Sequence, residues 1–533
     1  MARNSIAILL LWCTTALCSL AQVNRHVVFF KDKAGTSFVI DRPNEFLSTR
    51  SLERRRKNAV AVTEEDLPVT AGYLTQLRQA GANVFFASRW FNAALVEATD
   101  PVMQAVATLP FVMRTERVAP GSKLSSGKTR QVKNRKESGI APETLGQLSM
   151  LGIDAMHTEG IRGEGVWVAV FDSGFEGVNI SGPFQHLING QQIKDAFDFV
   201  GNTRNVFQYD DHGTEVFSVI SARSATFTGG AFNAQFSLFV TEDVSSEYRI
   251  EEFNWLLAAE RADSAGADII QSSLGYNIFD DATMNYPKSA LDGEVALVSR
   301  AAREALDRGI MVVASAGNEG NNNWRLVTPP ADVAGVLAVG SITSGQTRSS
   351  FSSVGPTADG RIKPDVVALG SGTQVVRPNG NNGFTSGTSV AAPLITSLAA
   401  GLLQRFPDLT VSALYNLITG SASQSANPDN VLGYGLPNYG RAVKSMLPYQ
   451  PEEEITIFPN PTTGTTQVLL KEAGQQVSIS VHDVQGRPIY NLTTEITWRN
   501  NPLEINTSDW PAGMYLMTVR TSNSSKTEKL VKN

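Results

Sequence analysis

The sequence predicts an α/β domain with a central parallel sheet, preceded by a small α+β unit and followed by a small β-sandwich. Between about Leu145 and Met446, short apolar runs alternate with helical segments, the pattern of a parallel sheet covered by helices on both faces. Beyond residue 455, short segments alternate apolar and polar residues between glycine-containing turns, which is typical of antiparallel strands.

Length and composition allow several folded domains. The chain has 533 residues, for which about two to four domains are expected. A hydrophobic content of 42% indicates a globular protein with a large core. The formal net charge of −6 argues against nucleic acid as a partner.

The first 21 residues have the pattern of a secretory signal peptide. Arg3 gives a positive start, Ile6 to Trp12 an apolar stretch, and Ser19 to Ala21 a cleavage site of mainly small residues. The apolar stretch is shorter than the roughly 20 residues that a membrane span needs. Cys13 and Cys18 both lie here, so we expect a mature chain without disulfides or a cysteine-ligated zinc site.

Residues 22–117 form the predicted α+β unit. Expected strands are Val27–Phe30, Val84–Phe86 and Ala93–Glu97, and expected helices are Tyr73–Gln79 and Val102–Leu109. Residues 118–144 have little apolar pattern and a crowd of Lys and Arg. They are interpreted as either a solvated linker or a protease-sensitive processing segment. The signal before them and the catalytic motifs after them favour processing.

Residues 145–447 hold the predicted parallel sheet. Expected strands are Val166–Phe171, Phe236–Val240, Asp268–Ile270, Ile310–Ala314 and Val336–Val339, with helices at Ile250–Ala265 and Ala296–Arg308. Sites in such sheets form at the carboxyl ends of strands, where Asp172 and Asn318 are placed. The segment Val390–Phe406 is interrupted by Pro393 and polar residues, which indicates a buried helix rather than a membrane span.

Two segments complete the chain. Residues 448–454 have the composition of a linker. Residues 455–533 are the predicted β-sandwich, with its clearest strand at Gln476–Val481.

Three glycine-rich motifs carry the chemistry. They are Phe171-Asp172-Ser173-Gly174, Asp211-His212-Gly213-Thr214 and the run from Thr385 to Pro393 that contains Ser389. A serine hydroxyl becomes a strong nucleophile when an imidazole accepts its proton, and a buried carboxylate fixes the tautomer of that imidazole. The three motifs together therefore predict nucleophilic acyl transfer.

Each catalytic candidate has a simpler alternative. Ser389 lies where a helix begins, so it is either a capping serine or a nucleophile, and the other two motifs favour the nucleophile. His212 is the predicted general base and acid, with Asp172 as its orienting carboxylate. The remaining histidines, His26, His157, His186 and His482, lack glycine-rich flanks and are interpreted as surface or packing residues.

Neighbouring polar residues receive separate roles. Asp210 and Asp211 are adjacent to His212 in sequence and cannot easily reach its ring, so they are predicted to cap the following helix. Asn318 lies in a glycine turn after an apolar strand and is the predicted oxyanion-hole donor, with the Ser389 backbone N–H as its partner. The alternative for Asn318 is an ordinary turn asparagine.

These segments resemble the subtilisin-like serine peptidase family, whose triad order is also Asp, His, Ser. The resemblance implies a three-layer sandwich, endopeptidase activity on protein or peptide substrates, and a substrate strand between two chain segments. In this chain Val390 replaces a usual methionine, and Glu215 occupies a position often held by histidine, where it could alter a subsite. The residues that match the two substrate-binding edges are Ser273, Leu274 and Gly275, and Ser315, Ala316 and Gly317.

The resemblance extends to both flanks and to cofactors. Residues 22–117 are similar to the propeptides of that family, which act as folding chaperone and inhibitor. No cofactor is required; the family allows structural calcium, but no carboxylate spacing here defines a metal site.

The tail resembles the C-terminal sorting domain of type IX secretion in Bacteroidetes. The resemblance rests on Phe458–Gly464, Asp483–Arg487, Trp510–Tyr515 and Lys529–Lys532. It implies recognition of residues 455–533 by the secretion machinery after passage through the periplasm, with release or attachment at the outer-membrane surface. A carbohydrate-binding or spacer sandwich is the alternative, although the aromatic residues form no evident sugar-stacking set.

The sequence thus predicts a secreted serine endopeptidase made as a zymogen, with no membrane span in the mature chain and no nucleic-acid partner. A catalytically inactive binding or adhesion protein on the same fold is the main alternative. The presence of all four chemical residues weighs against it. An esterase or ligase on this fold is a third alternative.

Overall fold

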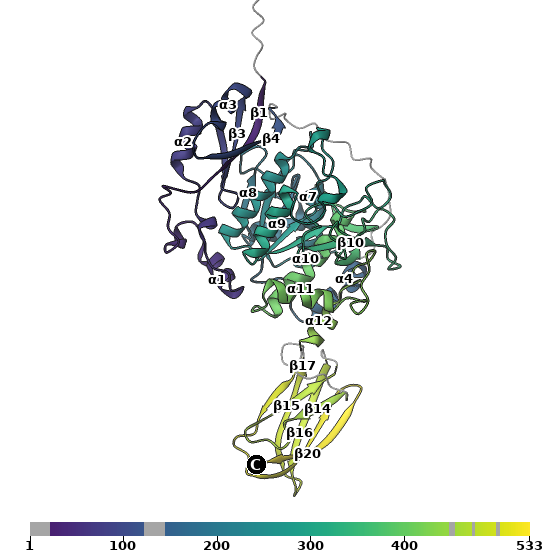
Figure 1. The fold of residues 1–533 in the computed structure, drawn as a ribbon. Coiled ribbons are helices and arrows are strands. Elements are labelled where there is room, and N and C mark those ends of the chain that lie inside the picture. Colours follow the sequence, from purple (N-terminus) through teal and green to yellow (C-terminus); the bar gives the residue numbers. More distant parts are fainter. Residues whose placement is uncertain (1–21, 122–143, 447–452, 472–474, 497–500) are drawn as a thin grey trace, which may run out of the picture. The chain divides into compact units, whose positions relative to one another are not determined.

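The computed structural model describes residues 22–121, 144–446, 453–471, 475–496 and 501–533 (Figure 1). The predicted signal peptide, the basic run at residues 123–136 and most of the predicted linker at residues 448–454 lie outside the described residues. The chain divides into two compact units, one formed by Met1–Ser37 and Pro68–Lys123 and the other by Phe38–Leu67 and Leu124–Asn533.

The first unit is a four-stranded antiparallel sheet with two helices, in the order β2-β3-β1-β4. Val28, Leu77 and Val106 belong to its apolar core. The predicted strands and helices of this unit are confirmed, but the start of the linker at residue 118 was placed too early, because β4 continues to Pro120. Its elements are β1 (Val23–Phe30), α2 (Ala71–Gln79), β2 (Asn83–Ser88), β3 (Ala93–Thr99), α3 (Asp100–Ala107) and β4 (Val112–Pro120).

One segment departs from the continuous domain predicted for residues 22–117. Phe38–Leu67 belongs to the second compact unit and contains helix α1 (Thr49–Lys57) between two short 3-10 helices, η1 (Pro43–Glu45) and η2 (Glu64–Asp66). Helix α1 begins after Ser48, whose side chain accepts a hydrogen bond from the Ser51 amide. Local sequence pattern could not reveal this, because its partners at the ends of α8 and α9 lie more than 200 residues away.

The second unit contains a seven-stranded parallel sheet in the order β11-β10-β9-β8-β5-β7-β6. The predicted strands are confirmed, whereas β6 and β11 were not expected. Strand β6 lies at an edge and carries charged residues, and β11 has only four residues, so neither gives a clear apolar run. The strands are β5 (Trp167–Asp172), β6 (Ile193–Asp198), β7 (Gln235–Val240), β8 (Ile269–Ser272), β9 (Met311–Ser315), β10 (Leu337–Ile342) and β11 (Val366–Leu369).

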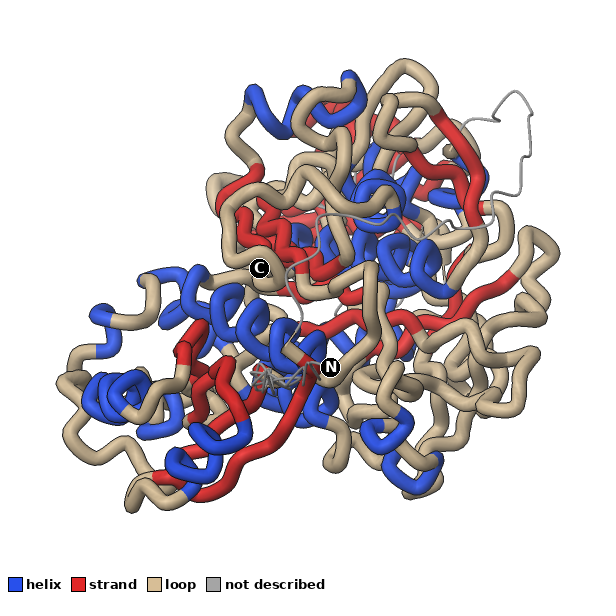
Figure 2. Tube along the Cα trace, turned by 90° about the horizontal axis from the view of Figure 1, so that it is seen from above, coloured by secondary structure: helices blue, strands red, loops and turns tan. Residues whose placement is uncertain are grey.

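Helices lie around this sheet (Figure 2). The side chains of Val168 and Val170 join the core that includes α7 and α10, whereas the ring of Phe171 packs against Trp255 of α8 at 5.2 Å. Successive residues of β5 therefore serve opposite faces. The helices are α4 (Leu145–Ser149), α5 (Ile153–Thr158), α6 (Gln185–Asn189), α7 (His212–Ser221), α8 (Ile250–Ala265), α9 (Leu297–Asp307), α10 (Thr388–Arg405), α11 (Val411–Gly420) and α12 (Tyr439–Ser445).

Helix α10 runs through the core, packed against α7 and against β8 to β11. A short antiparallel hairpin, β12 (Thr373–Val376) and β13 (Asn382–Thr385), precedes it. In the part of the chain that the structure describes, no helix has the length and apolar character to cross a membrane.

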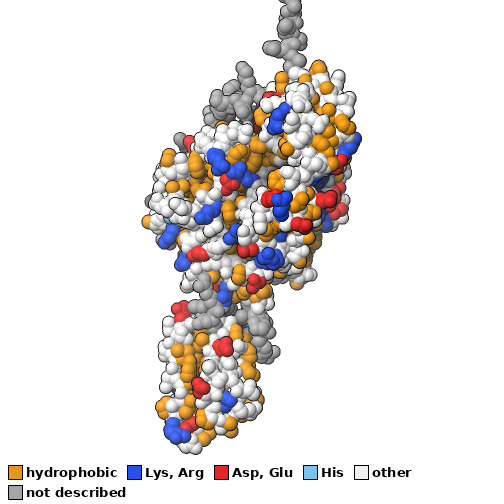
Figure 3. Space-filling view, turned by 90° about the vertical axis from the view of Figure 1, so that its left-hand side faces the viewer, with side chains coloured by type: hydrophobic (Ala, Val, Ile, Leu, Met, Phe, Trp, Pro, Cys, Tyr) orange, Lys and Arg blue, Asp and Glu red, His pale blue; other side chains and the backbone are white. Residues whose placement is uncertain are grey.

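The C-terminal residues form two antiparallel sheets, β14-β15-β18 and β17-β16-β19-β20, around a core that includes Val481 and Met517. The predicted strand Gln476–Val481 lies within β16. On the face shown in Figure 3, acidic and basic side chains are interspersed. The strands are β14 (Ile455–Phe458), β15 (Thr465–Leu470), β16 (Gln475–Asp483), β17 (Pro488–Ile496), β18 (Leu503–Asn506), β19 (Gly513–Arg520) and β20 (Ser525–Lys532).

Candidate active site

Asp172 and His212 meet at the carboxyl edge of the parallel sheet. Asp172 is the last residue of β5 and His212 the first residue of α7, and Asp172 Oδ1 lies 2.7 Å from His212 Nδ1. A Cβ at Gly213 would lie 2.2 Å from the Gly174 carbonyl oxygen and 2.9 Å from Asp172 Cβ. Glycine after the histidine is therefore what lets α7 approach the end of β5 closely enough for this bond.

The Asp172 carboxylate is fully buried and held by several donors. Oδ1 also accepts the Ser173 backbone N–H at 2.8 Å and the Ser173 hydroxyl at 3.1 Å. The carbonyl oxygen of Asp172 accepts from the Thr241 amide at 3.0 Å, which ties the end of β5 to that of β7. Oδ1 is thus fixed in position to receive the Nδ1–H of His212.

The protonation of His212 reflects its acidic surroundings. Burial acts to lower its pKa, but the charge and hydrogen bond of Asp172, with the charges of Asp210 and Asp211, outweigh burial and raise the pKa to about 9. The side chain retains 35% of its surface exposed, so water moderates this shift. The free Nε2 is the only ring nitrogen left for a second partner, because Nδ1 is held by Asp172.

The capping role predicted for Asp210 and Asp211 is wrong. Asp211 occupies the N-cap position of α7, but its side chain accepts no capping hydrogen bond. Asp210 instead accepts from the Ser173 hydroxyl at 2.9 Å and from the Asp211 amide at 2.8 Å. Asp210 therefore braces the turn that carries Asp172, and both carboxylates add negative charge beside His212.

Ser389 lies in the first turn of α10, where backbone N–H groups have no intrahelical acceptor. A Cβ at Gly387 would lie 2.8 Å from Ser389 Oγ and 3.8 Å from Asn318 Nδ2, so glycine is needed there and the two polar atoms face the same small space. Helices α7 and α10 pack against each other. Among the described residues no hydrogen bond joins Ser389 Oγ to His212; such bonds often tighten only when substrate binds.

Asn318 follows the carboxyl end of β9 and is oriented by Thr388. Asn318 Oδ1 accepts the Thr388 backbone N–H at 2.9 Å and its hydroxyl at 3.0 Å. The amide NH₂ therefore points away from Thr388, and its Nδ2 lies on the Ser389 side. Thr388 belongs to the same motif as Ser389, but sequence reasoning gave it no role.

A buried chain of polar groups supports the backbone of Ser389. The Ser273 hydroxyl donates to the Ser389 carbonyl oxygen at 2.6 Å and accepts from Gln271 Nε2 at 2.8 Å. The Thr396 hydroxyl in turn donates to Gln271 Oε1. Ser273 follows the carboxyl end of β8, and β8 lies between β5 and β9 in the sheet. These bonds therefore hold the start of α10 at the sheet edge that carries Asp172 and Asn318.

The two predicted substrate edges differ in the structure. For Leu274 and Gly275, which are partly or fully exposed, no backbone hydrogen bond occurs among the described residues, so a substrate strand could pair there. The Ala316 amide instead donates to the Val339 carbonyl oxygen, and its carbonyl oxygen accepts from the Thr328 amide. The Gly317 amide donates to the Thr388 hydroxyl oxygen, and its carbonyl oxygen accepts from the Ser353 amide. These backbone groups therefore have partners within the protein, and the expected contact of Ser315, Ala316 and Gly317 with substrate stays a prediction.

Glu215 faces a partner within the protein. It is buried on α7 and forms an ion pair with Arg377, whose Nη2 also donates to the Phe384 carbonyl oxygen at 3.0 Å. The pair ties α7 to the β12–β13 hairpin. The expected influence of Glu215 on a substrate subsite therefore stays a prediction.

An acidic cluster lies between β7 and α8. Carboxylate oxygens of Glu242, Glu247 and Glu251 are within 4.8 Å of one another. Burial and the charge of Glu247 raise the pKa of Glu242 to about 8, although Tyr276 and Thr241 donate hydrogen bonds to it. Acidic groups of this kind are common without a metal ion, and the expectations of no required cofactor and no metal site stay predictions.

Three segments of the chain each match a known protein family. Residues 163–435 match the family described as Subtilase family, peptidase S8. Residues 25–137 match the peptidase S8 propeptide domain of Bacteroidota. Residues 456–533 match the secretion system C-terminal sorting domain.

Individual relatives match more than half of the chain. Subtilisin NAT of Bacillus subtilis subsp. natto is 30% identical over 300 residues, which are 56% of this chain and 70% of the relative. Subtilisin of Bacillus pumilus is 30% identical over 282 residues, covering 52% of this chain and 90% of the relative. The crystal structure of MycP1 without its N-terminal propeptide aligns with a TM-score of 0.45 at 24% identity, over 58% of this chain and 99% of that one.

Proposed function

The chain belongs to the subtilase family of serine peptidases, and from this premise we propose that Ser389, His212 and Asp172 form its catalytic triad. The proposal rests on the 2.7 Å hydrogen bond between Asp172 Oδ1 and His212 Nδ1, at the sheet edge where Asn318 and Ser389 also lie. The expected reaction is hydrolysis of internal peptide bonds through an acyl-enzyme.

The first half of the reaction uses the geometry at the start of α10. Ser389 Oγ attacks the scissile carbonyl carbon while its proton passes to His212 Nε2. The carbonyl oxygen becomes an oxyanion, which Asn318 Nδ2 and the Ser389 backbone N–H stabilise by hydrogen bonds. The imidazolium is stabilised by the Asp172 carboxylate, then donates its proton to the leaving amine nitrogen as the peptide C–N bond breaks.

The second half repeats these steps with water. His212 Nε2 accepts a proton from the water as its oxygen attacks the acyl carbon. Collapse of the second tetrahedral intermediate breaks the bond to Ser389 Oγ, which regains its proton from His212. The product is a free carboxylic acid, and the enzyme returns to its starting state.

The flanking segments support export as a zymogen. The sorting domain indicates type IX secretion to the cell surface or the extracellular space. We assign the propeptide segment the role of an inhibitor that is cut from the peptidase within residues 118–144. Among the described residues, the backbone of Leu274 and Gly275 makes no hydrogen bond, and this supports pairing with an extended peptide substrate.

Active-site labelling tests the triad against the inactive-adhesin alternative. Purified mature protein is expected to react with a fluorophosphonate probe at Ser389, because only an activated serine attacks that phosphorus centre. Ser389→Ala should show no labelling, and His212→Ala should lose at least about 99% of the labelling rate. Equal labelling of wild type and Ser389→Ala would refute the proposal. An exposed-serine variant, Ser344→Ala, is the matched control.

A further inference from the structure

Helix α1 covers the C-terminal ends of two helices of the peptidase. The Ser48 amide donates to the Ser264 carbonyl oxygen at 2.9 Å, and the Ser48 hydroxyl donates to that of Ala265 at 2.8 Å. Arg50 Nε donates to the Gly266 carbonyl oxygen at 3.0 Å. Carbonyl groups at the end of α8 that lack an intrahelical partner are thus satisfied from α1.

Arg54 connects the ends of both helices. Its Nη1 donates to the Ala267 carbonyl oxygen at 2.8 Å, beyond α8, and its Nε to the Arg308 carbonyl oxygen at 3.3 Å, at the C-cap of α9. A guanidinium at a helix C-terminus is also favoured by the helix dipole. Asn58 completes the contact at Gly309, since a Cβ there would lie 2.7 Å from Asn58 Nδ2.

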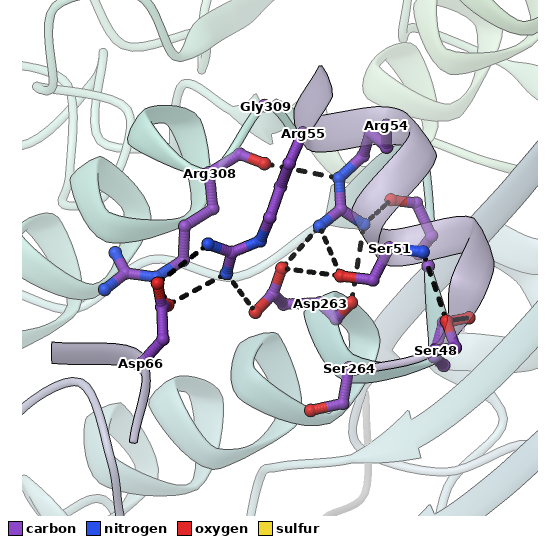
Figure 4. A network of polar contacts seen from close by, with 12 residues as sticks. Ser48, Ser51, Arg54, Arg55, Asp66, Asp263, Ser264, Arg308 and Gly309 are labelled. Carbon is purple, nitrogen blue, oxygen red and sulfur yellow. Dashed lines mark hydrogen bonds and ion pairs between the residues drawn. The ribbon is translucent and has the colours of Figure 1, made fainter. Parts of the chain in front are cut away.

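Beneath these contacts lies a buried network of charges (Figure 4). Arg54 and Arg55 of α1 both pair with Asp263 of α8, the Arg55 contact at 2.8 Å. Arg55 also forms a bidentate pair with Asp66, both bonds at 2.9 Å, and Asp66 accepts from Arg308 Nε at 2.9 Å. All five side chains are at most 5% exposed, so separating α1 from α8 and α9 would break up paired charges.

The contact surface lies at the sheet edge opposite the catalytic residues. Arg50 Nη2 donates to the Gly165 carbonyl oxygen at 2.7 Å, just before β5, and pairs at 2.5 Å with Asp268, just before β8. Asp172 lies at the other end of the six-residue strand β5, about 20 Å away at roughly 3.3 Å per residue. Occupation of this surface therefore leaves the catalytic edge free.

We propose that Phe38–Leu67 is a structural component of the peptidase domain that stays bound after the precursor is processed. This inference rests on the proposed function only for the cut within residues 118–144. That cut separates α1 covalently from the peptidase, and the described network then holds the two chains together. The mature enzyme would consist of a peptidase chain and a retained peptide that contains α1 and Asp66.

The sequence of α1 is consistent with survival of this peptide during processing. Arg54 to Lys57 is a basic run of the type that proteases cleave, yet Arg54 and Arg55 are buried in a helix and their peptide bonds are inaccessible. The preceding loop is open, with Val39 42% and Ile40 38% exposed. Cleavage in that loop would separate the N-terminal part of the first unit from the segment that contains α1, and α1 would remain bound.

The test uses the precursor, with the propeptide segment still attached. It carries Ser389→Ala and a recognition site for a specific protease inserted within residues 122–143. After cutting, limited digestion with a nonspecific protease is followed by gel filtration and denaturing mass spectrometry. A peptide containing Thr49–Lys57 and Asp66 is expected to co-elute with the peptidase in equimolar amount. Elution of a folded peptidase without this peptide would overturn the proposal.

Matched arginine variants localise the effect. Arg55→Met removes a buried cation and should reduce the retained peptide at least tenfold after gel filtration. Arg56→Met changes an exposed arginine of the same helix and should leave retention unchanged. Equal retention in both variants would refute the role of the network.

A second measurement tests the proposal even if the Arg55→Met variant does not fold. In the cut Ser389→Ala protein with Arg55 intact, the amides of α1 should exchange hydrogen as slowly as those of α8, and rapid exchange in α1 alone would overturn the proposal. The added protease makes the cut and Ser389 is absent, so retention is measured without catalysis. If the probe fails to label Ser389, the retention result still stands. If the peptide is not retained, the labelling result still stands.

Discussion

At the scale of single residues, the site depends on side chains that other side chains orient. Asn318 presents its NH₂ group toward Ser389 because both donors of Thr388 occupy its carbonyl oxygen. Asp172 in the same way binds His212 through an oxygen that Ser173 also holds. Such preorganisation matters because a donor that is already in place needs no reorganisation as charge develops.

Asn318→Ala is expected to lower kcat by about 10²–10³ with little change in KM, the loss that removing such a donor causes in subtilisin, a relative of this chain. The physical reason is that the oxyanion forms only in the transition state. Steady-state kinetics on a chromogenic peptide checks this. Asn323→Ala, an exposed asparagine nearby, is the control. Full activity of Asn318→Ala would exclude the oxyanion role.

The acid limb of kcat/KM should have its midpoint near pH 9, the raised pKa of His212. His212 accepts a proton only when neutral, and its neutral fraction grows as pH rises through that pKa, so activity should increase with pH across this range. Asp210→Asn removes a charge that raises the pKa and should move the midpoint toward neutral pH. A pH–rate profile of both proteins measures this, and identical midpoints would contradict it.

At the scale of elements, the start of α10 is attached to the sheet by hydrogen bonds as well as by apolar packing. Thr396, Gln271 and Ser273 form a buried chain that ends at the Ser389 carbonyl oxygen. Each residue of the chain donates a hydrogen bond to the next group, so loss of one residue leaves a buried polar group without its partner. The same bonds set the position of Ser389 relative to β8.

Thr396→Val should lower the free energy of unfolding by about 1–3 kcal/mol, because Gln271 Oε1 would lose the Thr396 hydroxyl donor while remaining buried. Urea unfolding in the Ser389→Ala background, which prevents self-digestion, measures the change. Thr158→Val, an exposed threonine on α5, should change stability by less than about 0.5 kcal/mol. Equal effects of the two substitutions would show that the buried bond contributes nothing.

At the scale of the whole molecule, the chain has separate apolar cores. The peptidase core draws on residues from Leu148 to Val443, and the sandwich core on residues from Ile455 to Leu530. A core that contains no residue of its neighbour can form without it. We therefore expect the peptidase domain and the sorting domain to fold independently of each other.

Removal of residues 448–533 should leave the thermal midpoint of the peptidase within about 2 °C of the full chain, both measured by calorimetry with Ser389→Ala. The truncated protein should fail to reach the cell surface or the medium, because it lacks the matched sorting domain. Fractionation of expressing cells checks the second outcome. A large fall in the midpoint, or normal export, would contradict the division of roles.

The sequence determined much of this protein, because its strongest signals are local. Glycines beside Asp172, His212 and Ser389 mark places where backbone segments approach closely, and apolar runs mark the buried strands of the sheet. Charged edge strand β6 and the four-residue β11 gave no such run and were missed. The capping role of Asp210 was wrong because its carboxylate accepts from Ser173, 37 residues earlier in the sequence.

Only the tertiary structure decided where Phe38–Leu67 belongs. Its position depends on Arg54 and Arg55 finding Asp263 and the open ends of α8 and α9, more than 200 residues away. An ion pair across such a distance leaves no periodic trace in sequence, whereas a motif that forms one turn does. Sequence therefore pointed to the candidate chemical groups, and long-range packing decided how they are oriented and which segment supports the opposite edge of the sheet.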